Sequence, residues 1–119
     1  AMSKRILVVD DSGLMRHRIV KCLTDAGHEV VGKAKDGSEA VDLYRALRPD
    51  VVTMDVTMRG KDGITAAMEI LDLDEGASII FYTLLDSPLM TARIQSVPVK
   101  KLVRKGDEVD LLHTLASLS

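Results

Sequence analysis

Short apolar runs alternate along the whole chain with longer segments in which apolar residues recur at helical spacing. The short runs are rich in branched residues. The first, third and fourth are almost continuously apolar, which is typical of strands buried on both faces of a parallel sheet. The predicted strands cover residues 5–9, 29–33, 51–54, 78–82 and 99–103.

A signal for the start of a helix follows each predicted strand. The signals are N-cap side chains, acidic residues in the first turn, and a serine before a first-turn proline. They lie at Ser12, at Asp36 with Glu39, at Asp62, at Ser87 with Pro88, and at Asp107 with Glu108. A strand followed by a helix five times predicts an α/β fold, with right-handed crossovers and helices on both faces of a five-stranded parallel sheet.

Length and composition limit the classes of function. The 119 residues, of which 46% are hydrophobic and 29% charged, predict one compact domain. We expect it to span residues 2–119, because Ala1 before Met2 is interpreted as a remnant of expression. A net charge of −2 and a short basic run at 100–105 indicate neither nucleic-acid nor membrane binding. With a single cysteine, Cys22, and no apolar run near the roughly 20 residues of a membrane span, we expect a cytoplasmic protein.

Polar side chains follow four of the predicted strands at the point where each strand ends. Asp10 and Asp11 follow the first strand, Asp55 the third, Thr83 the fourth and Lys105 the fifth. Ligands of open parallel sheets bind outside the carboxyl ends of the strands, so we expect these five side chains to converge.

These residue types suit phosphoryl transfer. Clustered carboxylates repel one another unless a cation joins them, and their oxygens are the ligands that Mg²⁺ prefers. A carboxylate beside the metal can attack phosphorus, while a lysine and a hydroxyl neutralise and position the transferring oxygens. The histidines lack metal-ligand spacing and are expected to be solvated or packed; they are His17, His28 and His113.

The chain resembles the receiver domains of two-component response regulators, among them the single-domain chemotaxis regulators. The segments that carry the resemblance are residues 6–12, residues 50–58 with Asp62-Gly63, Thr83 and Lys105. The resemblance implies a (βα)5 flavodoxin-like fold with strand order 2-1-3-4-5.

It also implies a role for each matching residue. Mg²⁺ would be held by Asp10, Asp11 and Asp55 with the backbone carbonyl of Thr57. Asp55 would accept a phosphoryl group from the phosphohistidine of a sensor histidine kinase or a phosphotransfer protein.

Two further residues would complete the switch. Thr83 would turn inward to bond the phosphoryl group, and Lys105 would pair with one of its oxygens. A downstream output protein or domain would then bind the surface of the fourth helix, fifth strand and fifth helix. Such a switch catalyses its own phosphorylation and dephosphorylation, without turnover of a separate substrate.

Five positions depart from the family pattern. Arg59 and Gly106 each stand where the family has a proline, and Leu84 stands where it has a small residue. Leu102 replaces an aromatic residue, and Pro98 replaces a glycine. The positions that carry ligands are kept, so the chemistry is better supported than the route to the output. Leu84 is expected to crowd the mouth of the pocket.

The departures near the fifth strand give two predictions. Without a proline, the peptide before Gly106 is predicted to be trans, because a cis bond at a non-proline residue costs roughly 2.5–4 kcal/mol. With Leu102 in place of an aromatic ring, no ring can follow the movement of Thr83. Output is therefore expected to use packing shifts of the fourth helix and its neighbouring loops.

Two other functions are compatible with parts of this pattern. Leu84, Leu102 and Gly106 would suit an atypical receiver that binds partners independently of phosphorylation. A haloacid-dehalogenase-like phosphatase also uses an aspartate nucleophile at a strand end. Its nucleophile, however, follows the first strand with a second aspartate two residues on, whereas Asp10 and Asp11 are adjacent.

Overall fold

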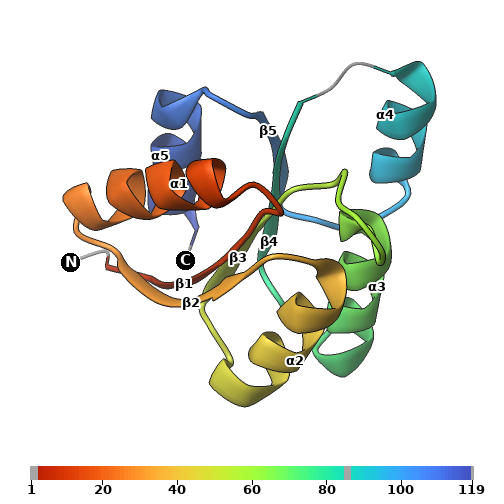
Figure 1. Ribbon diagram of the computed structural model, residues 1–119, viewed down its shortest axis with the longest axis horizontal. Coiled ribbons are helices and arrows are strands. Elements are labelled where there is room, and N and C mark those ends of the chain that lie inside the picture. The colour runs from red at the N-terminus through yellow and green to blue at the C-terminus, as the bar shows by residue number, and fades with distance from the viewer. Residues whose placement is uncertain (1–2, 85–86, 119) are drawn as a thin grey trace.

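The computed structural model describes residues 3–84 and 87–118. Met2 and Ser119, the bounds of the predicted domain, lie outside this part. Strands and helices alternate along the described chain (Figure 1). The strands are β1 Arg5–Val9, β2 Glu29–Ala34, β3 Val51–Met54, β4 Ile79–Thr83 and β5 Lys101–Arg104. The helices are α1 Gly13–Asp25, α2 Gly37–Leu47, α3 Gly63–Leu73, α4 Pro88–Gln95 and α5 Glu108–Ser117.

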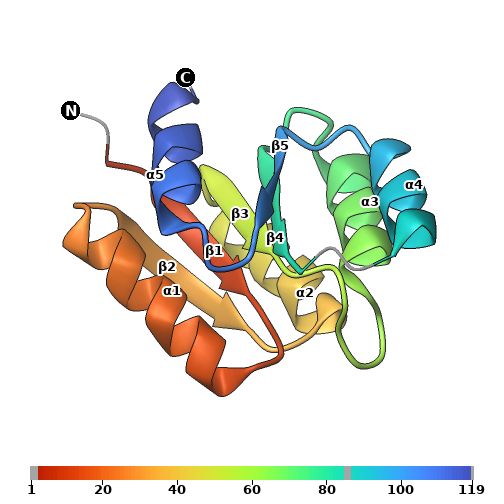
Figure 2. The same cartoon turned by 90° about the horizontal axis from the view of Figure 1, so that it is seen from above.

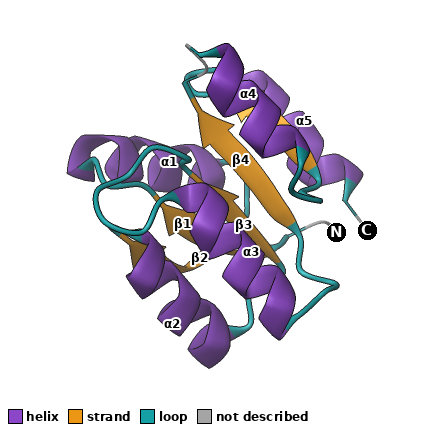
Figure 3. Cartoon of the chain, turned by 90° about the vertical axis from the view of Figure 1, so that its right-hand side faces the viewer, coloured by secondary structure: helices purple, strands orange, loops and turns teal. Residues whose placement is uncertain are grey.

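The strands form one parallel sheet in the order β2-β1-β3-β4-β5, which confirms the predicted fold class. Helices α1 and α5 cover one face of this sheet, and α2, α3 and α4 cover the other (Figures 2 and 3). The order reverses between β1 and β3, so the carboxyl ends of these two strands border the crevice in which such sheets bind ligands.

Two apolar layers hold the sheet between its helices. Side chains alternate along β1, so Leu7 and Val9 pack on the side of α2, α3 and α4, and Ile6 and Val8 pack on the side of α1 and α5. All four are at most 1% exposed. Burial on both faces explains why the sequence of this strand is continuously apolar.

Each helix begins at the cap that the sequence predicts. The side chain of the cap residue accepts a hydrogen bond from the backbone N–H three residues further on, which satisfies one free donor of the first turn. The caps are Ser12, Asp36, Asp62, Ser87 and Asp107. Between residues 3 and 84 and between 87 and 118, no helix has both the length and the apolar character needed to cross a bilayer.

The fifth strand begins later than predicted, at Lys101 rather than residue 99. The chain first makes a tight turn, in which the N–H of Val99 donates to the carbonyl of Val97 at 2.8 Å. Pro98, inside this turn, has no N–H to offer a ladder. The branched residues before Lys101 therefore pack against the core without joining the sheet.

A partly buried hydrogen bond joins α2 to the end of α3. The hydroxyl of Tyr44 donates to Oδ2 of Asp74 at 2.8 Å, and Tyr44 is 3% exposed. Burial, followed by the hydrogen bond to Asp74 and its charge, raises the pKa of Tyr44 to about 12.

We expect Tyr44→Phe to lower the free energy of unfolding by about 1 kcal/mol at neutral pH, because one net hydrogen bond is lost. The folded pKa of Tyr44 lies above its unfolded value of 10.0. The stability that this phenol contributes is therefore present below pH 10 and is lost as pH rises toward about 12. Urea unfolding of both proteins across this range should show the loss in the wild type and a smaller loss in the variant. Parallel pH profiles would contradict the prediction.

Candidate functional site

Three carboxylates meet at the carboxyl end of the sheet. Asp10 directly follows β1 and Asp55 directly follows β3. The backbone N–H of Asp10 donates to the carbonyl of Ala34 at 3.1 Å, and that of Asp55 donates to the carbonyl of Val9 at 2.9 Å, so both residues extend the sheet. Asp10 is 0% exposed and Asp55 is 5% exposed, whereas Asp11 is exposed. One oxygen from each of the three aspartates lies within 4.8 Å of the others.

The start of α1 fixes the orientation of the first aspartate. Oδ1 of Asp10 accepts a hydrogen bond from the N–H of Ser12 at 2.9 Å, and Ser12 itself caps α1. The guanidinium of Arg16 donates to the backbone carbonyl of Asp10 at 2.7 Å. Its own loop and helix therefore hold Oδ1 of Asp10 and the backbone of this residue.

Thr83 at the end of β4 and Lys105 after β5 bind the second buried carboxylate. Nζ of Lys105 lies 2.8 Å from Oδ2 of Asp10 and 3.2 Å from Oδ2 of Asp55. The hydroxyl of Thr83 donates to Oδ1 of Asp55 at 2.9 Å. The N–H of Lys105 also bonds the carbonyl of Thr83 at 2.9 Å, which keeps the ends of β4 and β5 together. Both carboxylate oxygens of Asp55 thus face a donor.

The electrostatics of the site favour a bound cation. Burial raises the pKa of Asp55, and Asp10 raises it further, although Lys105 and Thr83 act in the opposite direction. Burial lowers the pKa of Lys105, but its contacts with Asp10 and Asp55 outweigh this effect and raise it. Lys105 is therefore an ammonium at neutral pH. Three carboxylates around one ammonium leave an excess of negative charge that a divalent cation would neutralise.

A close backbone contact sets the position of the Asp55 loop against α3. The N–H of Gly63 donates to the carbonyl of Val56 at 2.8 Å. A Cβ atom on Gly63 would lie 2.1 Å from the carbonyl oxygen of Asp55, so only glycine fits here. The capping side chain of Asp62 also pairs with Arg93 of α4 at 3.3 Å. The Asp62-Gly63 pair therefore positions the end of β3 as well as the start of α3.

Comparison with known proteins identifies the family. The model of the response regulator receiver domain matches residues 6–116. The chain belongs to the response regulator receiver family. This membership favours a receiver over the phosphatase alternative, and the match spans every predicted site residue.

Individual relatives cover most of this receiver domain. The chemotaxis protein CheY of Thermotoga maritima is 40% identical over 104 residues, which is 87% of each chain. The protein CcdB of Bacillus subtilis is 39% identical over 113 residues, or 94% of each chain. Among solved structures, the CheX–CheY–BeF3–Mg²⁺ complex of Borrelia burgdorferi aligns with a TM-score of 0.87 and 29% identity, covering 95% of this chain and 87% of that chain.

The loop after β5 departs from the usual receiver sequence in a way that the structure makes visible. The peptide between Lys105 and Gly106 is trans, as predicted. Gly106 has a φ of +99°, and its N–H donates to the hydroxyl of Tyr82 at 2.9 Å. A proline would offer no such donor. Sequence reasoning missed this contact, although Tyr82 directly precedes Thr83 and Gly106 directly follows Lys105.

Two further departures, Leu84 and Leu102, lie on opposite sides of β4 and β5. Leu84 is 56% exposed and lines an apolar hollow of about 240 Å³ together with Met15, Tyr82 and Lys105. Leu102 is partly buried and packs against the layer under α2, α3 and α4. Leu84 therefore lies beside the ammonium group of Lys105, whereas Leu102 belongs to the core.

We expect Leu84→Ala to speed phosphorylation or dephosphorylation of this receiver several-fold, because it removes an exposed side chain beside Lys105. The rates are measured with a small phosphodonor and, after its removal, by decay of the phosphorylated protein. Leu89→Ala is the matched control, since Leu89 is 74% exposed but belongs to α4. If neither rate changes in Leu84→Ala, the side chain does not restrict access.

Proposed function

We propose that this receiver domain accepts a phosphoryl group on Asp55 from the phosphohistidine of a sensor histidine kinase or a phosphotransfer protein. The groups around Asp55 carry the proposal. Its two carboxylate oxygens lie 2.9 Å from the hydroxyl of Thr83 and 3.2 Å from Nζ of Lys105, and two further carboxylates are close by. Such a set provides a nucleophile, a hydrogen-bond donor, a positive charge and ligands for a cation.

Mg²⁺ is the cation that the donor set fits. Asp10, Asp11 and Asp55 offer hard carboxylate oxygens, and the backbone carbonyl of Thr57 is the fourth proposed ligand. The excess negative charge of the cluster suits a divalent ion. When bound, the ion would neutralise charge on the phosphoryl oxygens. The Borrelia burgdorferi relative was solved with BeF3 and Mg²⁺, which supports this choice.

In the proposed reaction, a carboxylate oxygen of Asp55 forms a bond to phosphorus as the bond between phosphorus and the donor's histidine nitrogen breaks. Lys105 pairs with one phosphoryl oxygen. Thr83 gives up its hydrogen bond to Oδ1 of Asp55 and donates to another phosphoryl oxygen. Hydrolysis of the acyl phosphate by water then restores Asp55, so the domain acts as a switch that resets itself.

The proposed output surface consists of α4, β5 and α5. In place of an aromatic ring, Leu102 packs against the core, so movement of Thr83 would pass to the packing of α4 and its neighbouring loops. Amide chemical shifts on phosphorylation should therefore change within residues 86–106, of which residue 86 lies outside the described part of the chain. Changes confined to the pocket would contradict this route.

The proposed function is tested by intact mass measurement with acetyl phosphate, with and without Mg²⁺. The expected result is a gain of one phosphoryl group that requires the metal, and peptide mapping should place it on Asp55. A receiver that works independently of phosphorylation would show no gain under any of these conditions.

We expect Asp11→Ala to abolish Mg²⁺ binding and phosphorylation together, since it removes the exposed carboxylate of the cluster. Isothermal titration with Mg²⁺ measures the first effect and intact mass the second. Asp72→Ala, which removes an exposed carboxylate from α3 outside the cluster, should titrate and label like the wild type. Unchanged Mg²⁺ heats in Asp11→Ala would remove Asp11 from the metal site.

A further inference from the structure

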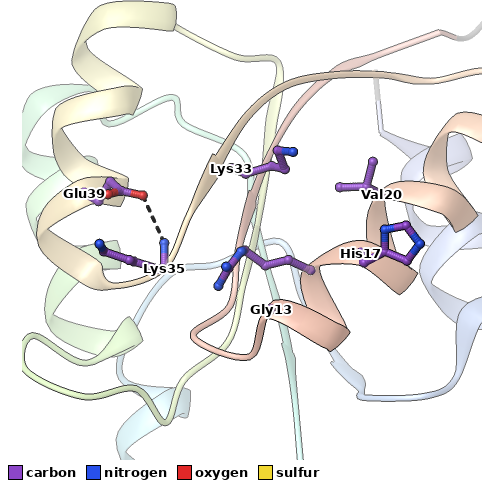
Figure 4. Close-up of a pocket in the computed structure, with 7 residues that line it drawn as sticks. Gly13, His17, Val20, Lys33, Lys35 and Glu39 are labelled. Carbon is purple, nitrogen blue, oxygen red and sulfur yellow. Dashed lines mark hydrogen bonds between the residues drawn. The ribbon is translucent and has the colours of Figure 1, made fainter.

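A basic cleft lies between α1 and the end of β2, beside the phosphoacceptor site and outside it (Figure 4). Its volume is about 480 Å³. We propose that it binds a carboxylate-rich segment of a protein partner. The lining residues are Gly13, Arg16, His17 and Val20 of α1, Lys33 of β2, Lys35 after it, and Glu39 of α2.

The cations of this cleft lack acidic partners of their own. Arg16, Lys33 and Lys35 form no ion pair within the described residues. Other surface cations such as Lys100 and Arg104 are also unpaired there, but these three line one cleft. Glu39 offsets only part of this positive charge, because it is the single acidic residue of the lining. Its carboxylate accepts a hydrogen bond from the backbone N–H of Lys35 at 3.2 Å (Figure 4). The cleft thus presents several donors to an anion and one carboxylate that is already engaged.

Protection of the sheet edge accounts for only part of this pattern. A lysine on an edge strand discourages pairing with another chain, and β2 is the edge strand on this side. Protection of this edge explains the presence of Lys33 by itself. Arg16, however, belongs to α1, and Lys35 lies beyond the end of β2. Cations from separate elements converge on the same space, which edge protection does not require.

The cleft continues toward the phosphoacceptor site. A second hollow of about 530 Å³ is lined by Asp11, Ser12, Lys35, Asp36 and Arg59, so Lys35 is common to both. A segment bound in the cleft would leave the adjoining part of its protein at the mouth of the site. This position suits a phosphodonor, and that part of the inference rests on the proposed function.

Charge favours a protein segment over nucleic acid. Binding along a phosphate backbone needs an extended basic surface. Here Asp11 and Asp36 line the second hollow, and the net charge of the chain is −2. A short run of carboxylates can instead pair locally with the cations of the cleft. Complementary charge of this kind sets the orientation of partners and speeds their encounter.

The test uses a labelled peptide of about ten glutamates, with a glutamine peptide of equal length as the uncharged control, in the absence of Mg²⁺ and phosphodonor. Lys33→Glu combined with Lys35→Glu should weaken binding of the glutamate peptide about tenfold or more, and added salt should weaken wild-type binding. Lys100→Glu combined with Arg104→Glu makes the same change of charge at exposed positions by β5, the opposite edge strand, and should weaken binding far less.

Several results would overturn the inference. Equal weakening in both double variants would show a general charge effect. Competition by inorganic phosphate at the same concentration as the peptide would indicate that the cleft is a site for small anions. Single-stranded DNA that binds more tightly than the peptide, and that depends on Lys33 and Lys35, would indicate a nucleic-acid site.

Labelling of Asp55 separates this inference from the proposed function. The Lys33→Glu/Lys35→Glu protein should label with acetyl phosphate at the wild-type rate, because neither side chain has a described contact with the site carboxylates. Failure of the wild type to label would refute the proposed function and leave the peptide result standing. A slower rate in this variant would show instead that the lysines act on the site itself.

Discussion

Asp55→Asn is expected to abolish phosphorylation by acetyl phosphate. The amide has nearly the shape of the carboxylate, and its oxygen can still accept the hydrogen bond from Thr83. It lacks the anionic oxygen that attacks phosphorus, and it removes one ligand of the proposed metal. Because one of three clustered carboxylates is lost, the metal-free variant should fold at least as stably as the wild type. Intact mass and urea unfolding measure the two effects.

The matched control is Asp50→Asn, at the opposite end of the same strand. Asp50 precedes β3, and its carboxylate accepts a hydrogen bond from the N–H of Arg5 at 2.8 Å, far from the convergent carboxylates. This variant should gain one phosphoryl group as the wild type does. If Asp55→Asn gains the same mass under the same conditions, the phosphorylated residue lies elsewhere.

Much of the fold could be predicted because its determinants are local. A branched apolar run and a capping side chain are each readable within a few residues, and all five caps were confirmed. The order of the strands is not local, since periodicity does not show which strands are neighbours. It came from the resemblance to receivers. The late start of β5 was missed, because the turn at Val97 and Val99 depends on a backbone hydrogen bond that composition does not reveal.

The convergence of the site residues follows from topology, whereas their contacts do not. Asp10 and Asp55 end strands that are neighbours, so their proximity is a consequence of the parallel sheet. The bridging of both by Lys105 depends on the reach of one side chain from β5, which lies two strands from β3. No residue pattern predicts such a bridge by itself.

Features assembled from several elements were the hardest to predict. The bond from Gly106 to Tyr82 spans 24 positions. In the basic cleft, Arg16 and Lys33 are also far apart in the chain, and the sequence alone gives each an ordinary role as a solvated side chain. Their shared space exists only once α1 lies beside β2.

Gly63→Ala is expected to destabilise the protein by about 3 kcal/mol and to slow phosphorylation, because the added methyl group collides with backbone. Its Cβ would lie 2.1 Å from the carbonyl oxygen of Asp55 and 2.8 Å from Cα of Val56. Backbone atoms of a buried strand end cannot rotate aside as a flexible side chain can. Relief requires α3 to move outward, which breaks the hydrogen bond from Gly63 to Val56, or Asp55 to leave its place beside Lys105.

Gly76→Ala is the control for this substitution. Gly76 is exposed, and the nearest atom to its added Cβ is a carboxylate oxygen of Asp74 at 3.4 Å, an ordinary contact. We therefore expect a change in unfolding free energy within about 0.5 kcal/mol and unchanged labelling. Urea unfolding gives the stabilities, and the rate of labelling by acetyl phosphate reports the position of Asp55. If Gly63→Ala unfolded at the wild-type midpoint, α3 and the end of β3 would have to be further apart than the structure places them.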